Sequence, residues 1–161
     1  MSIDKHNIIT LLDENSQDVV GGFLSQLSLE SQYSEDAKLH LMFLQSIFNL
    51  LSVQPLENLL NTMTEITITF NGYPRTKRYE LVKPLKVVPI YELRYAMNRN
   101  EHLRFLFFPY LYKEASNYVF VKYFKKTLIP NVDETDNMRD LTYEMYKRVR
   151  LNPEYYLEGT D

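Results

Sequence analysis

Between Pro89 and Pro130, positively charged residues interrupt three runs that otherwise have the apolar pattern of β-strands. The cations come from every run: Arg94 lies in Ile90–Ala96, Arg104 lies in His102–Leu111, and Lys125 and Lys126 directly follow Asn117–Phe124. Guanidinium groups offer rigid, forked donors to phosphate oxygens, and a lysine surrounded by other cations loses its proton more easily. Brought together by neighbouring strands, these residue types predict a site that binds phosphate and moves a proton.

Alternation along each strand predicts which side chains share a face. In the first run, Tyr91, Leu93 and Tyr95 form a face that suits packing against a helix. Arg94 projects from the opposite face. We therefore expect Arg94 and Arg104 to lie together on an open face of the sheet, joined by one of the two lysines.

Structural roles are open alternatives for these cations. Arg94 and Arg104 could pair with Glu92 or Glu101 across neighbouring strands, because arginines at strand centres are often ion-paired. The Lys-Lys pair could simply be a solvated strand end. A carboxylate within reach of the arginines would favour the structural alternative.

The charge of the chain is segregated along its length. Residues 1–70 hold 2 Lys/Arg and 9 Asp/Glu, residues 71–126 hold 12 and 4, and residues 127–161 hold 4 and 8. The basic middle segment predicts a local positive patch, although the net charge of −3 and the pI near 5.7 lack the global signature of a nucleic-acid binder.

The periodicity of apolar residues predicts an α+β fold. We expect a first strand at His6–Leu12, an antiparallel meander formed by the three basic runs, and a hairpin in the segment 63–80, around the turn dipeptide Asn71-Gly72. The strongest helix signal is Asp36–Ser52, and the other expected helices are Val19–Leu27, a short one from Pro55 to about Met63, and Asp133–Arg150. The twisted, mainly antiparallel sheet should pack on the N-terminal helices.

Length and composition limit the class of protein. The 161 residues fit a single domain, expected at 1–150, with 151–161 as a flexible tail. The chain has no cysteine, no run apolar enough for a membrane span and no leader-like N-terminus, so we expect a cytoplasmic protein without a membrane partner. No phosphate-loop, dinucleotide or metal-ligand motif is present, which predicts a site without cofactor or metal.

Several short motifs resemble the phage-derived, HigB-like branch of the RelE/ParE toxin superfamily over roughly residues 8–150. They are Asp18–Leu24 followed by Leu27, the Tyr91–Arg94 segment, Arg104 in an aromatic strand, and Phe124–Thr127 with Pro130 and Glu134. The order of elements, which is a strand, helices, an antiparallel meander and a C-terminal helix, is similar too. The resemblance implies a RelE-like fold.

The resemblance also implies an activity, which is that of an endoribonuclease toxin from a type II toxin–antitoxin pair. Such a toxin cleaves mRNA, typically on the ribosome, and is held inactive by a small helix-turn-helix antitoxin. Metal-independent attack by the 2′-hydroxyl of the RNA needs a base, charge stabilisation at the phosphate and a proton for the leaving 5′-oxygen. By this resemblance the catalytic residues are Arg94, Arg104, Lys125 and Lys126.

Further residues are expected to contact RNA. Lys122 and Tyr123 precede the lysine pair, and Tyr123 could stack a base or belong to the core. The hairpin is longer than the corresponding link in compact family members, and its Arg75, Lys77 and Arg78 could either bind RNA or cover a sheet edge. The alternative function is that of a catalytically inactive phage or prophage relative that serves as a protein-binding module.

Overall fold

The computed structural model describes residues 5–87, 89–127 and 134–158. In chain order the elements are β1 (His6–Thr10), α1 (Val19–Glu30), α2 (Glu35–Val53), a 3-10 turn (Leu56–Asn58), β2 (Met63–Phe70), β3 (Tyr73–Glu80), β4 (Val82–Pro84), β5 (Tyr91–Ala96), β6 (Glu101–Tyr112), β7 (Ala115–Thr127), α3 (Thr135–Leu151) and α4 (Pro153–Leu157). The expected α+β class is confirmed.

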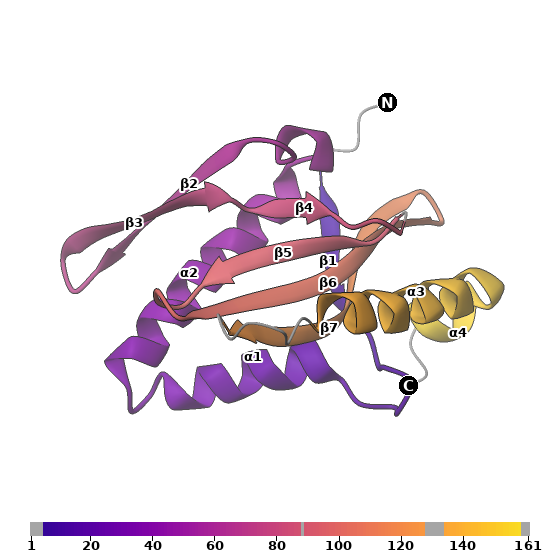
Figure 1. Ribbon diagram of the computed structural model, residues 1–161, viewed down its shortest axis with the longest axis horizontal. Helices are drawn as coiled ribbons and strands as arrows, with labels where there is room; N and C mark the ends of the chain where they lie inside the picture. The colour runs from indigo at the N-terminus through magenta and orange to yellow at the C-terminus, as the bar shows by residue number, and fades with distance from the viewer. Residues whose placement is uncertain (1–4, 88, 128–133, 159–161) are drawn as a thin grey trace.

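The main sheet has five strands in the order β1-β7-β6-β5-β4 (Figure 1). Its first strand runs parallel to β7, and the other neighbours are antiparallel. Strands β2 and β3 form a separate two-stranded sheet, which Figure 1 shows on the β4 side of the main sheet. The expected meander and hairpin are therefore both present.

The hairpin turns at Asn71 and Gly72, which both have positive φ angles, 51° and 83°. Asparagine and glycine tolerate this backbone region best, and the resulting twist matches that of the two flanking strands. This local chemistry explains why the dipeptide was a reliable hairpin signal.

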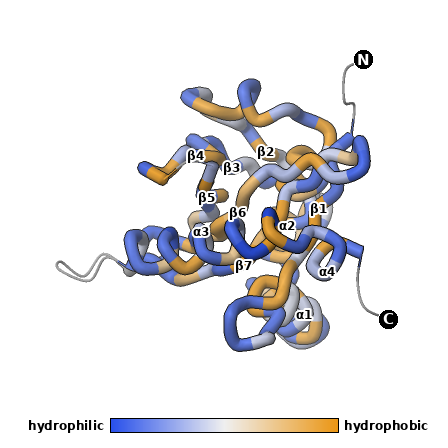
Figure 2. Tube along the Cα trace, turned by 90° about the vertical axis from the view of Figure 1, so that its right-hand side faces the viewer, coloured by the Kyte–Doolittle hydropathy of each residue, from blue (hydrophilic) through white to orange (hydrophobic). Residues whose placement is uncertain are grey.

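Helices lie on both faces of the main sheet, as Figures 1 and 2 show. On one face, α1 and α2 enclose the larger core, to which the sheet contributes Leu93, Tyr95, Phe105 and Phe107. On the other face, α3 contributes Met145 and Val149 to a smaller core with Ile90, Phe108, Val119 and Val121. The sheet is thus the middle layer of three.

Helix α2 follows its sequence pattern closely. Ser34 accepts a hydrogen bond from the backbone N–H of Ala37 at 3.2 Å, which caps the first turn. Phe43 and Ile47 are buried as their spacing predicts. Leu51 is buried too, whereas Leu50, which the same pattern placed inside, is only partly buried.

Two segments differ from the sequence expectation. The short helix expected from Pro55 to Met63 is a single 3-10 turn, because β2 already begins at Met63 and pairs with β3. The expected tail contains α4, whose Tyr156 and Leu157 pack against the smaller core. In both places tertiary contacts override a weak local pattern.

Candidate functional site

Strand register places the two arginines side by side on the sheet. Arg94 of β5 is directly opposite Arg104 of β6, and the next pair along these strands is Ala96 and His102. On β7, Lys126 is opposite His102. Because side chains alternate along a strand, Arg94, Arg104, His102 and Lys126 lie on the face opposite α1 and α2. The structure therefore places both arginines and one of the two lysines on the same face of the sheet.

Within the part of the chain that the structure describes, the two arginines share a single carboxylate. Glu92 Oε1 lies 3.9 Å from Arg94 Nε and 3.8 Å from Arg104 Nε. The pairing with Glu92 that the structural alternative expected is therefore present, at ion-pair distances too long for hydrogen bonds. Arg104 donates one hydrogen bond, from an Nη atom to the backbone oxygen of Leu103 at 3.1 Å. Arg94 Nε is buried without a hydrogen-bond partner among the described residues. Several guanidinium donors thus stay available.

This arrangement has an electrostatic cost. Arg104 is only 5% exposed, and burial lowers the pKa of its guanidinium, as does the charge of Arg94, while Glu92 opposes both effects. Like charges that face each other across strands are destabilising. One carboxylate for two guanidinium groups leaves a net positive charge that an anionic ligand would neutralise.

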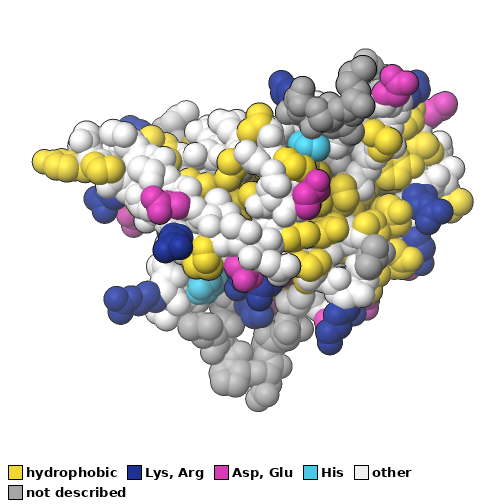
Figure 3. Space-filling model, turned by 90° about the horizontal axis from the view of Figure 1, so that it is seen from above, with side chains coloured by type: hydrophobic (Ala, Val, Ile, Leu, Met, Phe, Trp, Pro, Cys, Tyr) yellow, Lys and Arg dark blue, Asp and Glu magenta, His cyan; other side chains and the backbone are white. Residues whose placement is uncertain are grey.

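A pocket of about 300 Å³ opens above the arginines. It is lined from the main sheet by Arg94, Ala96, His102 and Arg104, and from β3 by Lys77, Arg78 and Tyr79. Figure 3, which looks down on the molecule, shows Lys and Arg side chains around a histidine at the lower left of the view. The inserted hairpin therefore forms one wall of a strongly basic pocket.

Lys77 attaches the hairpin to the main sheet. Its Nζ donates to the backbone oxygen of Ala96 at 2.6 Å and lies 5.3 Å and 5.1 Å from the ring centroids of Phe43 and Tyr95. Burial lowers the pKa of this ammonium. Lys77 was expected to contact RNA or to cover a sheet edge, and the contacts in the structure are those of an anchor for the hairpin.

The two remaining basic residues of the hairpin lie in different surroundings. Arg78 lines the pocket, whereas Arg75 is exposed near the turn of the hairpin and is not among the residues that line it.

Of the lysine pair, Lys125 lies opposite Leu103 and so projects to the face of α1 and α2, where it is 3.9 Å from Glu101. The expectation that Lys125 shares a catalytic cluster with the arginines is therefore corrected.

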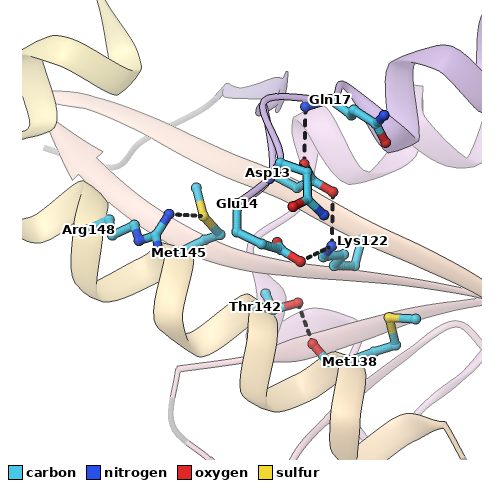
Figure 4. A network of polar contacts seen from close by, with 9 residues as sticks. Asp13, Glu14, Gln17, Lys122, Met138, Thr142, Met145 and Arg148 are labelled. Carbon is cyan, nitrogen blue, oxygen red and sulfur yellow. Dashed lines mark hydrogen bonds and ion pairs between the residues drawn. The ribbon is translucent and has the colours of Figure 1, made fainter.

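Lys122 is occupied by contacts within the protein. Figure 4 shows its side chain between Asp13 and Glu14. Its Nζ lies 3.0 Å from Asp13 Oδ2 and 2.9 Å from Glu14 Oε1, and the side chain is 8% exposed. Burial alone would raise the pKa of Asp13, but Lys122 and the backbone N–H groups of Gln17 and Asn15 outweigh it and lower this pKa. The expected RNA contact at Lys122 is replaced by an internal ion cluster.

Tyr123 is partly buried and packs against the larger core. Its ring centroid lies 4.6 Å from that of Phe23 on α1 and 6.0 Å from that of Phe105. Of the two roles considered for Tyr123, its placement is that of a core residue, on the face opposite the pocket. Pro130, which belongs to the same motif as Phe124–Thr127, lies outside the described residues.

Sequence reasoning gave no role in the site to two of the pocket residues. Tyr79 was one of many tyrosines, and only the approach of β3 to β5 gives it a special place. His102, which was expected only as the first residue of a strand run, is a half-buried lining residue. One sequence signal could have found them. Tyr79 lies two residues from Lys77, and His102 lies two residues from Arg104, so each shares a strand face with a residue that was already a candidate.

Within the described residues, no group of three or more His, Cys, Asp or Glu side chains could hold a metal ion. Of the helices in the described part of the chain, none is long and apolar enough to cross a membrane. No protein-family model, no curated protein and no solved structure matches this chain. The function must therefore be argued from the pocket and from the sequence motifs.

Proposed function

We propose that this protein is an RNA-binding endoribonuclease of the RelE-like, HigB-like toxin type, which cleaves mRNA in the cytoplasm and is controlled by an antitoxin. The observation that carries the proposal is the pair formed by Arg94 and Arg104, which face each other across two strands with one distant carboxylate between them. An RNA phosphate supplies the acceptor oxygens and the negative charge that this pair lacks.

The proposed chemistry needs no cofactor. The 2′-oxygen of the RNA attacks the adjacent phosphorus, the bond from phosphorus to the 5′-oxygen breaks, and the products carry a 2′,3′-cyclic phosphate and a 5′-hydroxyl. Arg94 and Arg104 stabilise the charge that accumulates on the phosphorane oxygens. The 2′-hydroxyl loses a proton and the leaving oxygen gains one. His102, which lines the pocket, and Lys126, which lies opposite His102 on the same face, are the proposed groups for these transfers.

The order of elements supports the family part of the proposal. A first strand, two helices, an antiparallel meander and a C-terminal helix follow one another as the resemblance implies. The Tyr91–Arg94 motif and Arg104 both contribute to the pocket wall. Action on ribosome-bound mRNA and inhibition by a small helix-turn-helix antitoxin belong to the same proposal, as what the family resemblance brings to it.

The direct test is induction in a bacterial host, followed by measurement of growth and of mRNA 5′ ends. The wild type should slow growth and create new 5′ ends, and Arg104→Ala should do neither. Lys125→Ala is the matched control, since this exposed lysine lies on the opposite face and should leave both effects intact. A wild type that neither slows growth nor cuts mRNA would refute the nuclease.

Binding gives a second test that does not depend on cleavage. Affinity for single-stranded RNA should fall with salt, with a logarithmic slope of about −0.7 for each phosphate contacted. Salt-independent binding, or none at low ionic strength, would favour the alternative of an inactive protein-binding module. The net charge of −3 is the observation that favours this alternative.

A further inference from the structure

The inserted hairpin places a tyrosine hydroxyl against the arginine pair. Strand β3 leads directly into β4, and at this junction the backbone N–H of Arg94 donates to the oxygen of Leu81 at 2.8 Å. Tyr79 lies two residues before Leu81 and lines the pocket together with Arg94 and Arg104. The charges of both arginines act on its hydroxyl.

The Tyr79 hydroxyl is buried and has no hydrogen-bond partner among the described residues. A buried polar group that is left unpaired costs free energy, so such groups are rare and call for an explanation. Burial raises the pKa of this hydroxyl, and the opposing effect of Arg104 and Arg94 is smaller. Tyr79 therefore stays protonated at physiological pH and can donate a hydrogen bond.

Arg94 Nε is a second unpartnered donor on the same pocket wall. Glu92, the nearest carboxylate to both arginines, is 3.8 Å or more from each Nε atom. Among the described residues, the side chains that line the pocket bring several donors and no carboxylate. A ligand that matches it must bring several acceptor oxygens and negative charge, which is the chemistry of a phosphate group.

We propose that Tyr79 is a substrate-binding residue whose hydroxyl donates to an oxygen of the same RNA phosphate that Arg94 and Arg104 bind. This inference rests on the proposed RNA function and deepens it, because it makes the β2–β3 hairpin a wall of the RNA site. Lys77 is then a positioning residue: its bond to Ala96 holds β3 over the arginines. The site accepts a single strand, which can lay one phosphate into the pocket.

The test compares Tyr79→Phe with Tyr73→Phe. Both residues lie on β3, and the same atom is removed, but Tyr73 is 71% exposed and does not line the pocket. The probe is a short single-stranded RNA with 2′-O-methyl groups, which binds but has no 2′-hydroxyl to attack. Fluorescence anisotropy should show about tenfold weaker binding for Tyr79→Phe, as expected for the loss of one hydrogen bond to a charged group, and no change for Tyr73→Phe.

Thermal unfolding without RNA distinguishes a binding role of Tyr79 from a structural one, because only a structural role predicts a lower unfolding midpoint for Tyr79→Phe. Removal of an unsatisfied buried hydroxyl should leave the midpoint of Tyr79→Phe unchanged or raise it. Weaker binding without loss of stability supports the inference. A destabilised Tyr79→Phe protein would reveal an internal partner for the hydroxyl and overturn the inference, as would equal RNA affinity in the wild type and Tyr79→Phe.

Cleavage of unmodified RNA separates this inference from the proposed function. A wild type that binds RNA through Tyr79 but does not cut it refutes the nuclease and leaves the binding role of Tyr79 in place. A Tyr79→Phe protein that binds as tightly as the wild type, with the wild type cutting RNA, refutes only the role of Tyr79. A wild type that does not bind RNA at low salt refutes both.

Discussion

Two cation clusters on the same face of the sheet have opposite balances of charge. Lys122 is one ammonium between two carboxylates at 3.0 Å and 2.9 Å, in a region covered by α3 and the segment after β1 (Figure 4). Arg94 and Arg104 are two guanidinium groups that share one carboxylate at 3.9 Å and 3.8 Å beside an open pocket. The first cluster surrounds its cation with two protein carboxylates, although Glu14 Oε2 is buried without a hydrogen-bond partner among the described residues. The second cluster has positive charge left for a ligand.

The contrast shows how buried charge can separate stability from function. When a buried cation is paired with carboxylates of the same chain, its removal is strongly destabilising, because the carboxylates are left buried without a counter-charge. A buried cation with too few partners costs stability and keeps donors available, which is typical of functional sites. The following predictions test this division.

Removal of Lys122 should have the largest effect, on stability. Lys122→Ala leaves Asp13 and Glu14 without their ammonium and should lower the free energy of unfolding by about 3–5 kcal/mol. Urea denaturation would measure it. Lys125→Ala, at an exposed pair, should change stability by less than about 0.5 kcal/mol. Equal effects of the two substitutions would remove the distinction between the clusters.

Arg104→Lys should affect catalysis. The ammonium keeps a positive charge beside Glu92, but it cannot reproduce the forked donor geometry. Single-turnover cleavage should slow by about 10²–10³-fold, while RNA affinity changes far less. Full activity of the lysine variant would reduce the role of Arg104 to general electrostatic attraction.

Neutralisation of one carboxylate in each cluster should give smaller effects of different kinds. Among the described residues, Glu92 is the only carboxylate within ion-pair distance of the two arginines, so in Glu92→Gln stability without RNA should fall by about 1–2 kcal/mol and RNA should bind more tightly. Glu14→Gln leaves Lys122 paired with Asp13 and should not change RNA affinity. Anisotropy and urea titrations on both variants would decide, and unchanged affinity in Glu92→Gln would contradict an anion site.

The smallest effect concerns pH and a half-buried histidine of α2. His40 Nδ1 is hydrogen-bonded to the Tyr95 hydroxyl at 2.6 Å, and burial lowers the pKa of His40 below its ordinary value of 6.5, with a further contribution from Lys77. The folded protein therefore binds this proton less readily than the unfolded chain. The stabilisation is complete above about pH 6.5 and declines as the pH falls below it.

The thermal midpoint should accordingly decrease as the pH falls from about 7 to about 5. His40→Gln should reduce this dependence without abolishing it, because burial also lowers the pKa of His6. Parallel pH profiles for the wild type and His40→Gln would show that His40 does not couple protonation to folding.

The sequence alone was sufficient for features with a regular period. Apolar residues spaced by three and four predicted α2, and alternation with a period of two predicted that Arg94 and Arg104 leave the sheet on one face. The hairpin followed from Asn71-Gly72. Each of these depends on interactions between residues close together in the chain, which local patterns record.

Only the tertiary structure decided what each cation meets. Lys122 contacts Asp13, which lies 109 residues away in the sequence, and no local pattern records such a pairing. Strand register alone separates Lys126 from Lys125, and the approach of β3 to β5 alone places Tyr79 beside the arginines. The types of charged residue are written in the sequence, but whether a buried charge is neutralised or left for a ligand depends on partners that only folding brings within a few ångströms.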